Sequence, residues 1–158
     1  MTTAVRPLDS LLVMAYIAQR AVKLGIFLNA TKLQKLMYIC YGVCLAKYDV
    51  RICDETPQAW QYGPVFANAL RDLRRNGLEH YMYVHTDEVN STFPEFIKNM
   101  IDATLNVFGG FSASQLVDWA HQPTAPWSIT SEHGKKLYSN IPDQLTIEFF
   151  KNNVVKSK

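Results

Sequence analysis

The stretch TKLQKLMYICYGVCLAKY, residues 31–48, is apolar around most of the helix that its spacing predicts. Two apolar stripes cover this circumference: Leu33, Leu36, Met37, Cys40, Val43 and Cys44, and then Tyr38, Tyr41, Leu45 and Tyr48. A helix that is apolar on most sides is buried on most sides, so we expect it at the centre of the fold. Thr31 and Gln34 have the spacing of a capping box. Gly42 inside the helix costs roughly 1 kcal/mol relative to alanine, and we interpret it as a close crossing by another backbone.

Helical spacing of apolar residues recurs on both sides of this central segment. It predicts further helices over residues 8–24, 64–76, 94–108, 112–120 and from 142 onward. Gly63 and Pro64 are interpreted as a hinge, with Pro64 in the first turn of a helix. Alternation over residues 81–89 predicts a half-buried strand that pairs with residues 60–62. We therefore expect a mainly α fold, one domain of about six helices with a small β-ribbon.

Composition favours a folded protein that binds another protein. The chain has 158 residues, of which 48% are hydrophobic and 19% charged, which suits one globular domain. Its net charge of +2 is too close to neutral to indicate nucleic acid or an anionic membrane as a partner. The basic residues Lys32, Lys35, Arg71, Arg74 and Arg75 are interpreted as a solvated face, although they would also suit an acidic partner.

Three cysteines, Cys40, Cys44 and Cys53, do not form the pattern of a secreted disulfide framework. We interpret them as small core residues in a reducing, cytoplasmic compartment. No apolar run reaches the roughly 20 residues that span a bilayer. A zinc site that joins these thiols to His85 or His121 is the alternative, but a Cys-x-x-x-Cys pair inside a buried helix is not the usual ligand spacing. We expect no metal and no cofactor.

Three blocks stand in order along the chain: Leu33-Gln34-Lys35-Leu36 with Tyr38 and Gly42, Ala59-Trp60-Gln61-Tyr62-Gly63-Pro64-Val65, and Trp119-Ala120-His121-Gln122 with Pro126-Trp127. Together they resemble the Panacea domain, also called the SocA-like antitoxin domain. The resemblance covers residues 8 to 130. We assign residues 1–150 to this domain and residues 151–158 to a polar C-terminal tail.

The resemblance implies a bacterial or phage antitoxin that neutralises a cognate toxin by direct binding, without enzymatic activity. It implies a toxin encoded by a neighbouring gene, and it leaves the oligomeric state open. The residues expected at the partner-binding surface come from the second and third blocks: Trp60, Tyr62, Gly63, Pro64, His121, Pro126 and Trp127. Aromatic residues in a fixed corner supply apolar area and shape for a partner. The competing interpretation is that the same aromatics only pack the corner against the core.

Two other functions stay open. A proteolytic adaptor would deliver the bound toxin to a protease and would need a second docking surface, for which the lysine-bearing tail over residues 151–158 is the candidate. An enzyme of the cysteine–histidine or zinc type is the alternative from a different class. Neither a nucleophile elbow nor a glycine-rich phosphate loop is found in the sequence.

Overall fold

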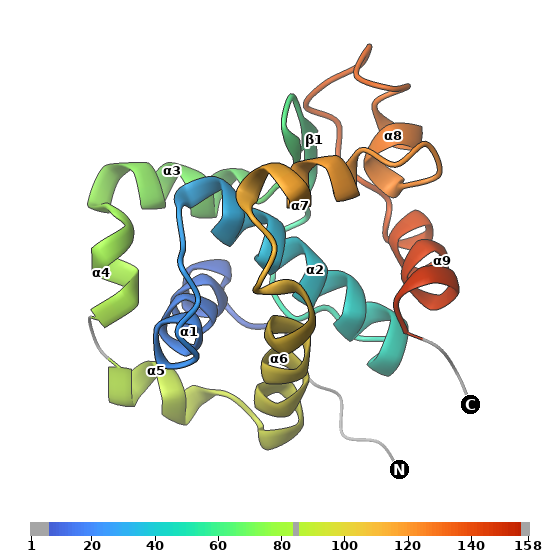
Figure 1. The fold of residues 1–158 in the computed structure, drawn as a ribbon. Coiled ribbons are helices and arrows are strands. Elements are labelled where there is room, and N and C mark those ends of the chain that lie inside the picture. The colour runs from blue at the N-terminus through green and yellow to red at the C-terminus, as the bar shows by residue number, and fades with distance from the viewer. Residues whose placement is uncertain (1–6, 84–85, 156–158) are drawn as a thin grey trace.

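Helix α2 (Ala30–Tyr48) runs through the middle of the molecule in the computed structural model, which describes residues 7–83 and 86–155 (Figure 1). Every residue of α2 from Lys32 to Leu45 is buried. The prediction of a central apolar helix is confirmed. Lys32 and Lys35, expected on a solvated face, are only 5% and 2% exposed, and that expectation is wrong because α2 is buried on all sides from Lys32 to Leu45.

Gly42 allows the ring of Phe150 to reach the surface of α2. A Cβ atom at Gly42 would lie 2.3 Å from two carbons of this ring. Phe150 belongs to α9 (Asp143–Asn153), which packs against α2. The close approach that the sequence predicted is present, but a side-chain ring makes it and not a second backbone.

Five helices contact α2: α1 (Ser10–Lys23), α3 (Ala67–Asn76), α6 (Glu95–Phe108), α7 (Ala113–Ala120) and α9. Three shorter helices lie outside this layer. Of these, α4 (Leu78–Tyr83) and α5 (Thr86–Thr92) contact α1, while α8 (Pro126–Thr130) contacts α7 and α9. Figure 1 shows α4 and α5 on one side of the molecule and α9 on the other. The described residues thus form nine helices in a mainly α fold, and α4, α5 and α8 are the ones that the sequence did not predict.

The two strands form a hairpin, β1 (Gln58–Trp60) and β2 (Gly63–Val65). They are antiparallel, with Ala59 opposite Pro64, and Gln61 and Tyr62 make a two-residue connection. Gly63 has a φ of 113°, which favours glycine. The predicted small β element is confirmed. However, β1 pairs with β2 and not with residues 81–89, and Pro64 lies in β2 and not in the first turn of a helix. Helix α3 begins only at Ala67. The Glu55 carboxylate accepts hydrogen bonds from the backbone amides of Asn68 and Ala69 in its first turn.

The strand predicted over residues 81–89 is wrong, because α4 and α5 occupy this region. The apolar residues that reach the core are Tyr81, Val89 and Phe93. Both α4 and α5 pack on α1, and the side-chain amide of Gln19 on α1 donates to the Tyr81 carbonyl at 3.1 Å. Packing against α1 therefore outweighs the local alternation. Residues 84 and 85 lie outside the described part of the chain.

Helix starts show which capping predictions were correct. The capping box of Ser112 and Gln115 is present at the start of α7, as predicted. The box predicted at Thr31 and Gln34 is wrong, because Asn29 caps α2 by accepting a hydrogen bond of 2.8 Å from the Lys32 amide. Gln34 is buried and its side-chain oxygen accepts from the Phe66 amide at 2.9 Å.

The C-terminal helix starts as predicted, with Pro142 as N-cap of α9. It continues to Asn153, and Val154 and Val155 pack against the core. The residues expected to form a tail from 151 onward thus belong to the folded body as far as Val155, and 156–158 lie outside the described part. Within the described ranges, none of the helices combines the length and the apolar character needed to cross a membrane.

Candidate functional site

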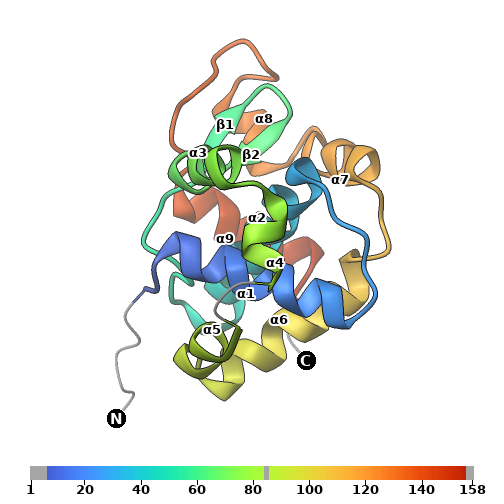
Figure 2. The same cartoon turned by 90° about the vertical axis from the view of Figure 1, so that its left-hand side faces the viewer.

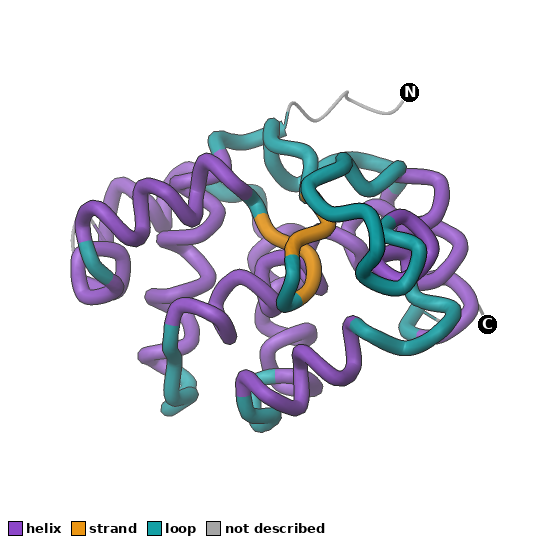
Figure 3. Tube along the Cα trace, turned by 90° about the horizontal axis from the view of Figure 1, so that it is seen from above, coloured by secondary structure: helices purple, strands orange, loops and turns teal. Residues whose placement is uncertain are grey.

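The hairpin, α8 and the loop over residues 131–141 meet at one end of the molecule, which we call the hairpin end (Figures 2 and 3). The loop runs beside β1. The Tyr138 amide donates to the Ala59 carbonyl at 2.7 Å, and the Ala59 amide donates to the Ser139 carbonyl at 2.9 Å. The rings of Trp60 and Tyr138 meet edge to face at a centroid distance of 5.5 Å. These contacts hold the loop and the hairpin in one fixed arrangement.

All seven residues predicted for partner binding lie at the hairpin end, but they differ in exposure. Tyr62 is 64% exposed at the tip of the hairpin. Trp60 and His121 are half-buried. The buried members are Gly63, Pro64, Pro126 and Trp127. The set therefore divides into side chains that a partner can touch and side chains that hold those in place.

Trp127 joins α8 to the hairpin. Its indole N–H donates a hydrogen bond of 2.6 Å to the carbonyl oxygen of Trp60. Pro126 occupies the first turn of α8, where its missing N–H leaves no unmet bond. The loop predicted over residues 121–127 is therefore ordered, and its last two residues are helical. Trp127 is 7% exposed, so most of its indole packs inside the protein.

The His121 ring contacts this indole edge to face, with ring centroids 3.9 Å apart. Burial lowers the pKa of His121, a hydrogen bond with the Gln61 backbone raises it, and the nearby Lys35 ammonium lowers it further. Its Nε2 atom is buried and has no hydrogen-bond partner among the described residues. Burial thus disfavours the charged form of the His121 ring, which packs between α7 and the hairpin.

Lys35 is a buried charged residue at the hairpin end whose position the sequence did not reveal. Its side chain leaves α2 beneath the hairpin, and its ammonium donates to the Pro64 carbonyl at 3.1 Å. A Cβ atom at Gly63 would lie 2.7 Å from Lys35 Cε, so glycine makes room for this side chain. Burial lowers the pKa of Lys35 to about 8. The sequence does contain an indication of this burial. Lys35 lies among apolar stripes on a helix predicted to be central, where its ammonium has no route to solvent.

A cavity of about 250 Å³ opens beside Lys35, and we call it the hairpin pocket. It lies between α2, α3, the hairpin and the loop over residues 131–141. No aspartate or glutamate is among the residues that line it. Those that matter below are Thr31, Lys35, Trp60, Tyr62, Arg74 and Tyr138.

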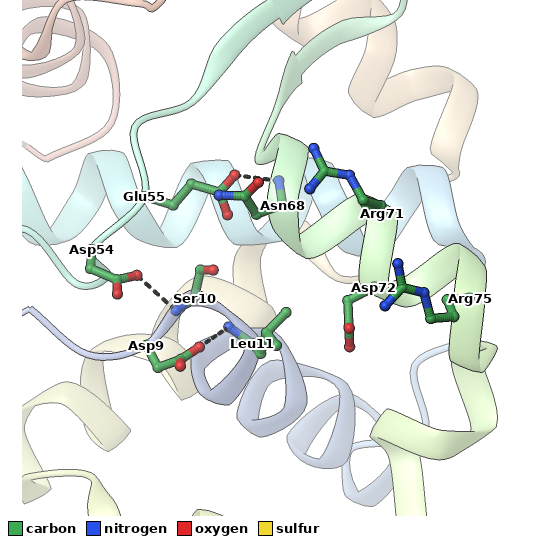
Figure 4. Close-up of a pocket in the computed structure, with 9 residues that line it drawn as sticks. All are labelled: Asp9, Ser10, Leu11, Asp54, Glu55, Asn68, Arg71, Asp72 and Arg75. Carbon is green, nitrogen blue, oxygen red and sulfur yellow. Dashed lines mark hydrogen bonds between the residues drawn. The ribbon is translucent and has the colours of Figure 1, made fainter.

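A second cavity of about 400 Å³ lies where α1 and α3 begin, and we call it the capping pocket (Figure 4). Figure 4 shows Asp9 and Asp54 at the start of α1 and Glu55 at the start of α3. Asp9 accepts a hydrogen bond from the Leu11 amide and Asp54 one from the Ser10 amide, at 2.8 and 3.1 Å. These acids are occupied in holding helix ends, which gives the pocket a structural role.

Comparison with known proteins places the chain in a family. The sequence model of the antitoxin SocA-like Panacea domain matches residues 33–128. This chain belongs to that family. It is also similar to antitoxin SocA of Caulobacter vibrioides (strain NA1000 / CB15N), with 26% identity over 130 residues, which cover 77% of this chain and 69% of that protein. No solved structure matches the chain significantly.

The part of the chain matched to the Panacea domain contains the whole predicted site. It begins inside α2 and ends inside α8, so the hairpin and all seven predicted residues lie within it. Lys35 and Arg74 lie within it too, whereas Tyr138 follows it. Helices α1 and α9, which both pack on α2, fall outside the matched segment.

The cysteines of this Panacea-domain protein are core residues. Cys40, Cys44 and Cys53 are free and buried. Burial raises the pKa of all three thiols, to about 12 for Cys44 and Cys53. Within the residues described, no three histidine, cysteine or acidic side chains lie close enough to hold a metal ion. His85, one ligand considered from the sequence, is outside them.

Proposed function

We propose that this chain is an antitoxin that neutralises a cognate protein toxin by direct protein–protein binding, and that the hairpin end is its binding surface. Membership of the antitoxin SocA-like family supports a role in a toxin–antitoxin system. The observation that carries the choice of surface is Tyr62, whose ring is 64% exposed at the tip of a hairpin inside the matched segment. An exposed aromatic on a rigid element is well suited to anchor a partner.

The seven predicted residues have two kinds of role in this proposal. Tyr62 and the edge of Trp60 contact the toxin. The others keep that surface fixed: Gly63, Pro64, His121, Pro126 and Trp127. A surface that is already ordered loses little conformational entropy when it binds, so more of the contact energy appears as affinity.

The proposed mechanism is occupation of the toxin's surface, without a chemical reaction. The three thiols are buried, and the ring of His121 packs against Trp127. We propose that the toxin is encoded by a neighbouring gene and that the pair meets in the cytoplasm.

Co-expression tests this proposal. The protein encoded beside this chain is expressed alone and together with the wild type, and rescue of growth is scored. Tyr62→Ala is expected to lose most of the rescue. Tyr83→Ala is the matched control, because Tyr83 is 62% exposed but lies on α4, away from the hairpin end. Both variants should keep the helical circular dichroism of the wild type.

The outcomes are separable. Full rescue by Tyr62→Ala would show that the hairpin end is not the binding surface. Absence of rescue by the wild type, with every flanking gene tested, would contradict the antitoxin role. If Tyr83→Ala alone loses rescue, the toxin-binding surface lies on the side of α4 and α5.

The proteolytic adaptor has less support than direct neutralisation. The tail that was its candidate docking segment is folded as far as Val155, where it packs on the core. An adaptor remains testable by removing only residues 156–158 and measuring the toxin's half-life in cells. A longer half-life with unchanged binding would favour the adaptor.

A further inference from the structure

We propose that the hairpin pocket receives the carboxylate of an aspartate or glutamate side chain of the toxin, which pairs with Lys35 and Arg74. This inference rests on the proposed function, and it adds the chemistry of the residue that the antitoxin recognises.

The charged residues that line the hairpin pocket are all positive. Lys35 at its base and Arg74 at its edge are both cationic, and no acidic residue lines it. The capping pocket provides the contrast, because its two arginines, Arg71 and Arg75, share the cavity with four carboxylates. An anionic group is therefore attracted to the hairpin pocket and not to the capping pocket.

Lys35 is a buried ammonium without a carboxylate partner in the described structure. It is 2% exposed, and the Pro64 carbonyl is its hydrogen-bond acceptor. An ammonium has three N–H donors, so two remain for a ligand. Burying a charge is costly unless it is paired, and a carboxylate in the pocket would supply the missing partner. The lowered pKa of Lys35 agrees with this environment.

The start of α2 strengthens the attraction for an anion. Thr31 in the first turn lines the pocket. The positive end of the helix dipole, in a helix of 19 residues, adds to the field of Lys35. This is a supporting contribution, since the two cationic side chains already define the pocket.

The rim of the pocket is aromatic and partly strained. Tyr62 and Tyr138 are each 64% exposed, and both line the pocket. Tyr138 has a φ of 74°, a left-handed conformation that is costly for a residue with a large side chain. Its amide bond to Ala59 and its ring contact with Trp60 hold it there. Tyrosine and arginine side chains are enriched among the residues that contribute most to binding at protein interfaces, and both kinds line this pocket.

The test measures binding of the purified neighbouring toxin to matched variants by isothermal titration calorimetry. Lys35→Met removes the charge but keeps the length of the side chain, and it is expected to weaken binding about thirty-fold or more, because the toxin's carboxylate stays buried and unpaired. Lys32→Met is the control: Lys32 is 5% exposed on the same helix and does not line the pocket. It should bind like the wild type.

Arg74→Ala supplies a second variant that keeps the core intact, since Arg74 is exposed. A loss of about three- to ten-fold is expected, and binding should become less sensitive to salt. Arg75→Ala is its control, because Arg75 lines the capping pocket. Equal effects of the two arginine variants would contradict the proposal.

The pKa of Lys35, measured in the free protein and in the complex, tests the proposal directly. Lysine uniformly labelled with carbon-13 is incorporated during expression, and the Lys35 Cε signal is assigned by its absence in Lys35→Met. Its pKa is expected to rise when the toxin binds, because a carboxylate favours the charged form. An unchanged pKa in the complex, or tight binding by Lys35→Met, would overturn the proposal while leaving the antitoxin function standing.

The source of the carboxylate is tested on the toxin. Adding Gly-Ser after the toxin's last residue moves its terminal carboxylate and should leave binding unchanged. Loss of binding in that arm would show that the terminal carboxylate is the ligand and would contradict our choice of a side chain. If the wild-type antitoxin fails to bind the toxin at all, the proposed function falls and this inference falls with it.

Discussion

The indole N–H of Trp127 donates a hydrogen bond of 2.6 Å to the carbonyl oxygen of Trp60, across 67 positions of sequence. This bond joins the third and second sequence blocks of the Panacea domain at one point. Through this bond α8 holds the hairpin in place.

Loss of this bond should lower the stability of the protein. Trp127→Phe keeps an aromatic ring but leaves the Trp60 carbonyl without its donor, and we expect a loss of about 1–3 kcal/mol in the free energy of unfolding. Urea denaturation measures it. Trp119→Phe is the control, because no hydrogen bond of its indole is found among the described residues; an equal loss there would show that ring size alone matters.

Gly42→Ala should destabilise the protein although alanine favours helix. The added Cβ would lie 2.3 Å from the buried Phe150 ring, and overpacking of this kind costs about 1–3 kcal/mol, against a helical gain of about 1 kcal/mol. Thermal unfolding compares it with Gly110→Ala, where a Cβ meets nothing within 4 Å. A second change, Phe150→Leu, should recover part of the loss in Gly42→Ala if the clash is its cause.

Lys35→Met should stabilise the free protein. The pKa of Lys35 is about 8 in the folded state against an ordinary 10.5, so between these values the unfolded chain binds more protons and stability rises with pH. The cost of burying the charge is fully present below pH 8 and fades towards pH 10.5. At pH 7 the variant should gain roughly 1–3 kcal/mol, and the gain should shrink as pH rises.

Urea denaturation at several pH values checks this, with Lys151→Met on the exposed face of α9 as control. A gain that does not change between pH 7 and pH 10 would mean that the charge of Lys35 is not its cause. A variant that is more stable yet binds its toxin less well is the expected signature of a residue kept for function.

The cysteines should be inert in the native protein. Cys40, Cys44 and Cys53 are buried and burial raises the pKa of each thiol, so little thiolate is present to react. At pH 8 a thiol reagent such as DTNB should label them only as fast as the protein unfolds. Ser114→Cys, at an exposed position of α7, supplies a fast reference. Rapid labelling of a native core cysteine would reopen the cysteine–histidine alternative.

The sequence predicted those parts of the fold whose signals are local and repeated. The apolar stripes of residues 31–48 identified the central helix, and Ser112 with Gln115 gave the start of α7. Prediction from sequence failed where contacts between residues far apart in the chain determine the local structure. The residue types over 81–89 alternate with the period of a strand, but packing against α1 favours helices that contain Tyr81 and Val89.

The same division holds for the candidate site. The hairpin aromatics were found because Trp60 and Tyr62 sit in a recognisable block. Lys35 was misplaced, because its environment depends on Pro64 and the hairpin folding over it. Tyr138 carries no local signal at all, since it reaches the pocket only through pairing of its loop with β1.

The recognisable part of this protein is smaller than the part that folds. The family match starts three residues into α2 and stops before α9, so excision at those borders would remove the Asn29 cap, α1, and the Phe150 ring that fills the notch at Gly42. A segment cut there would expose the buried central helix of the molecule to water and aggregate. Transplanting this recognition surface onto another protein therefore requires carrying both flanking helices along with it.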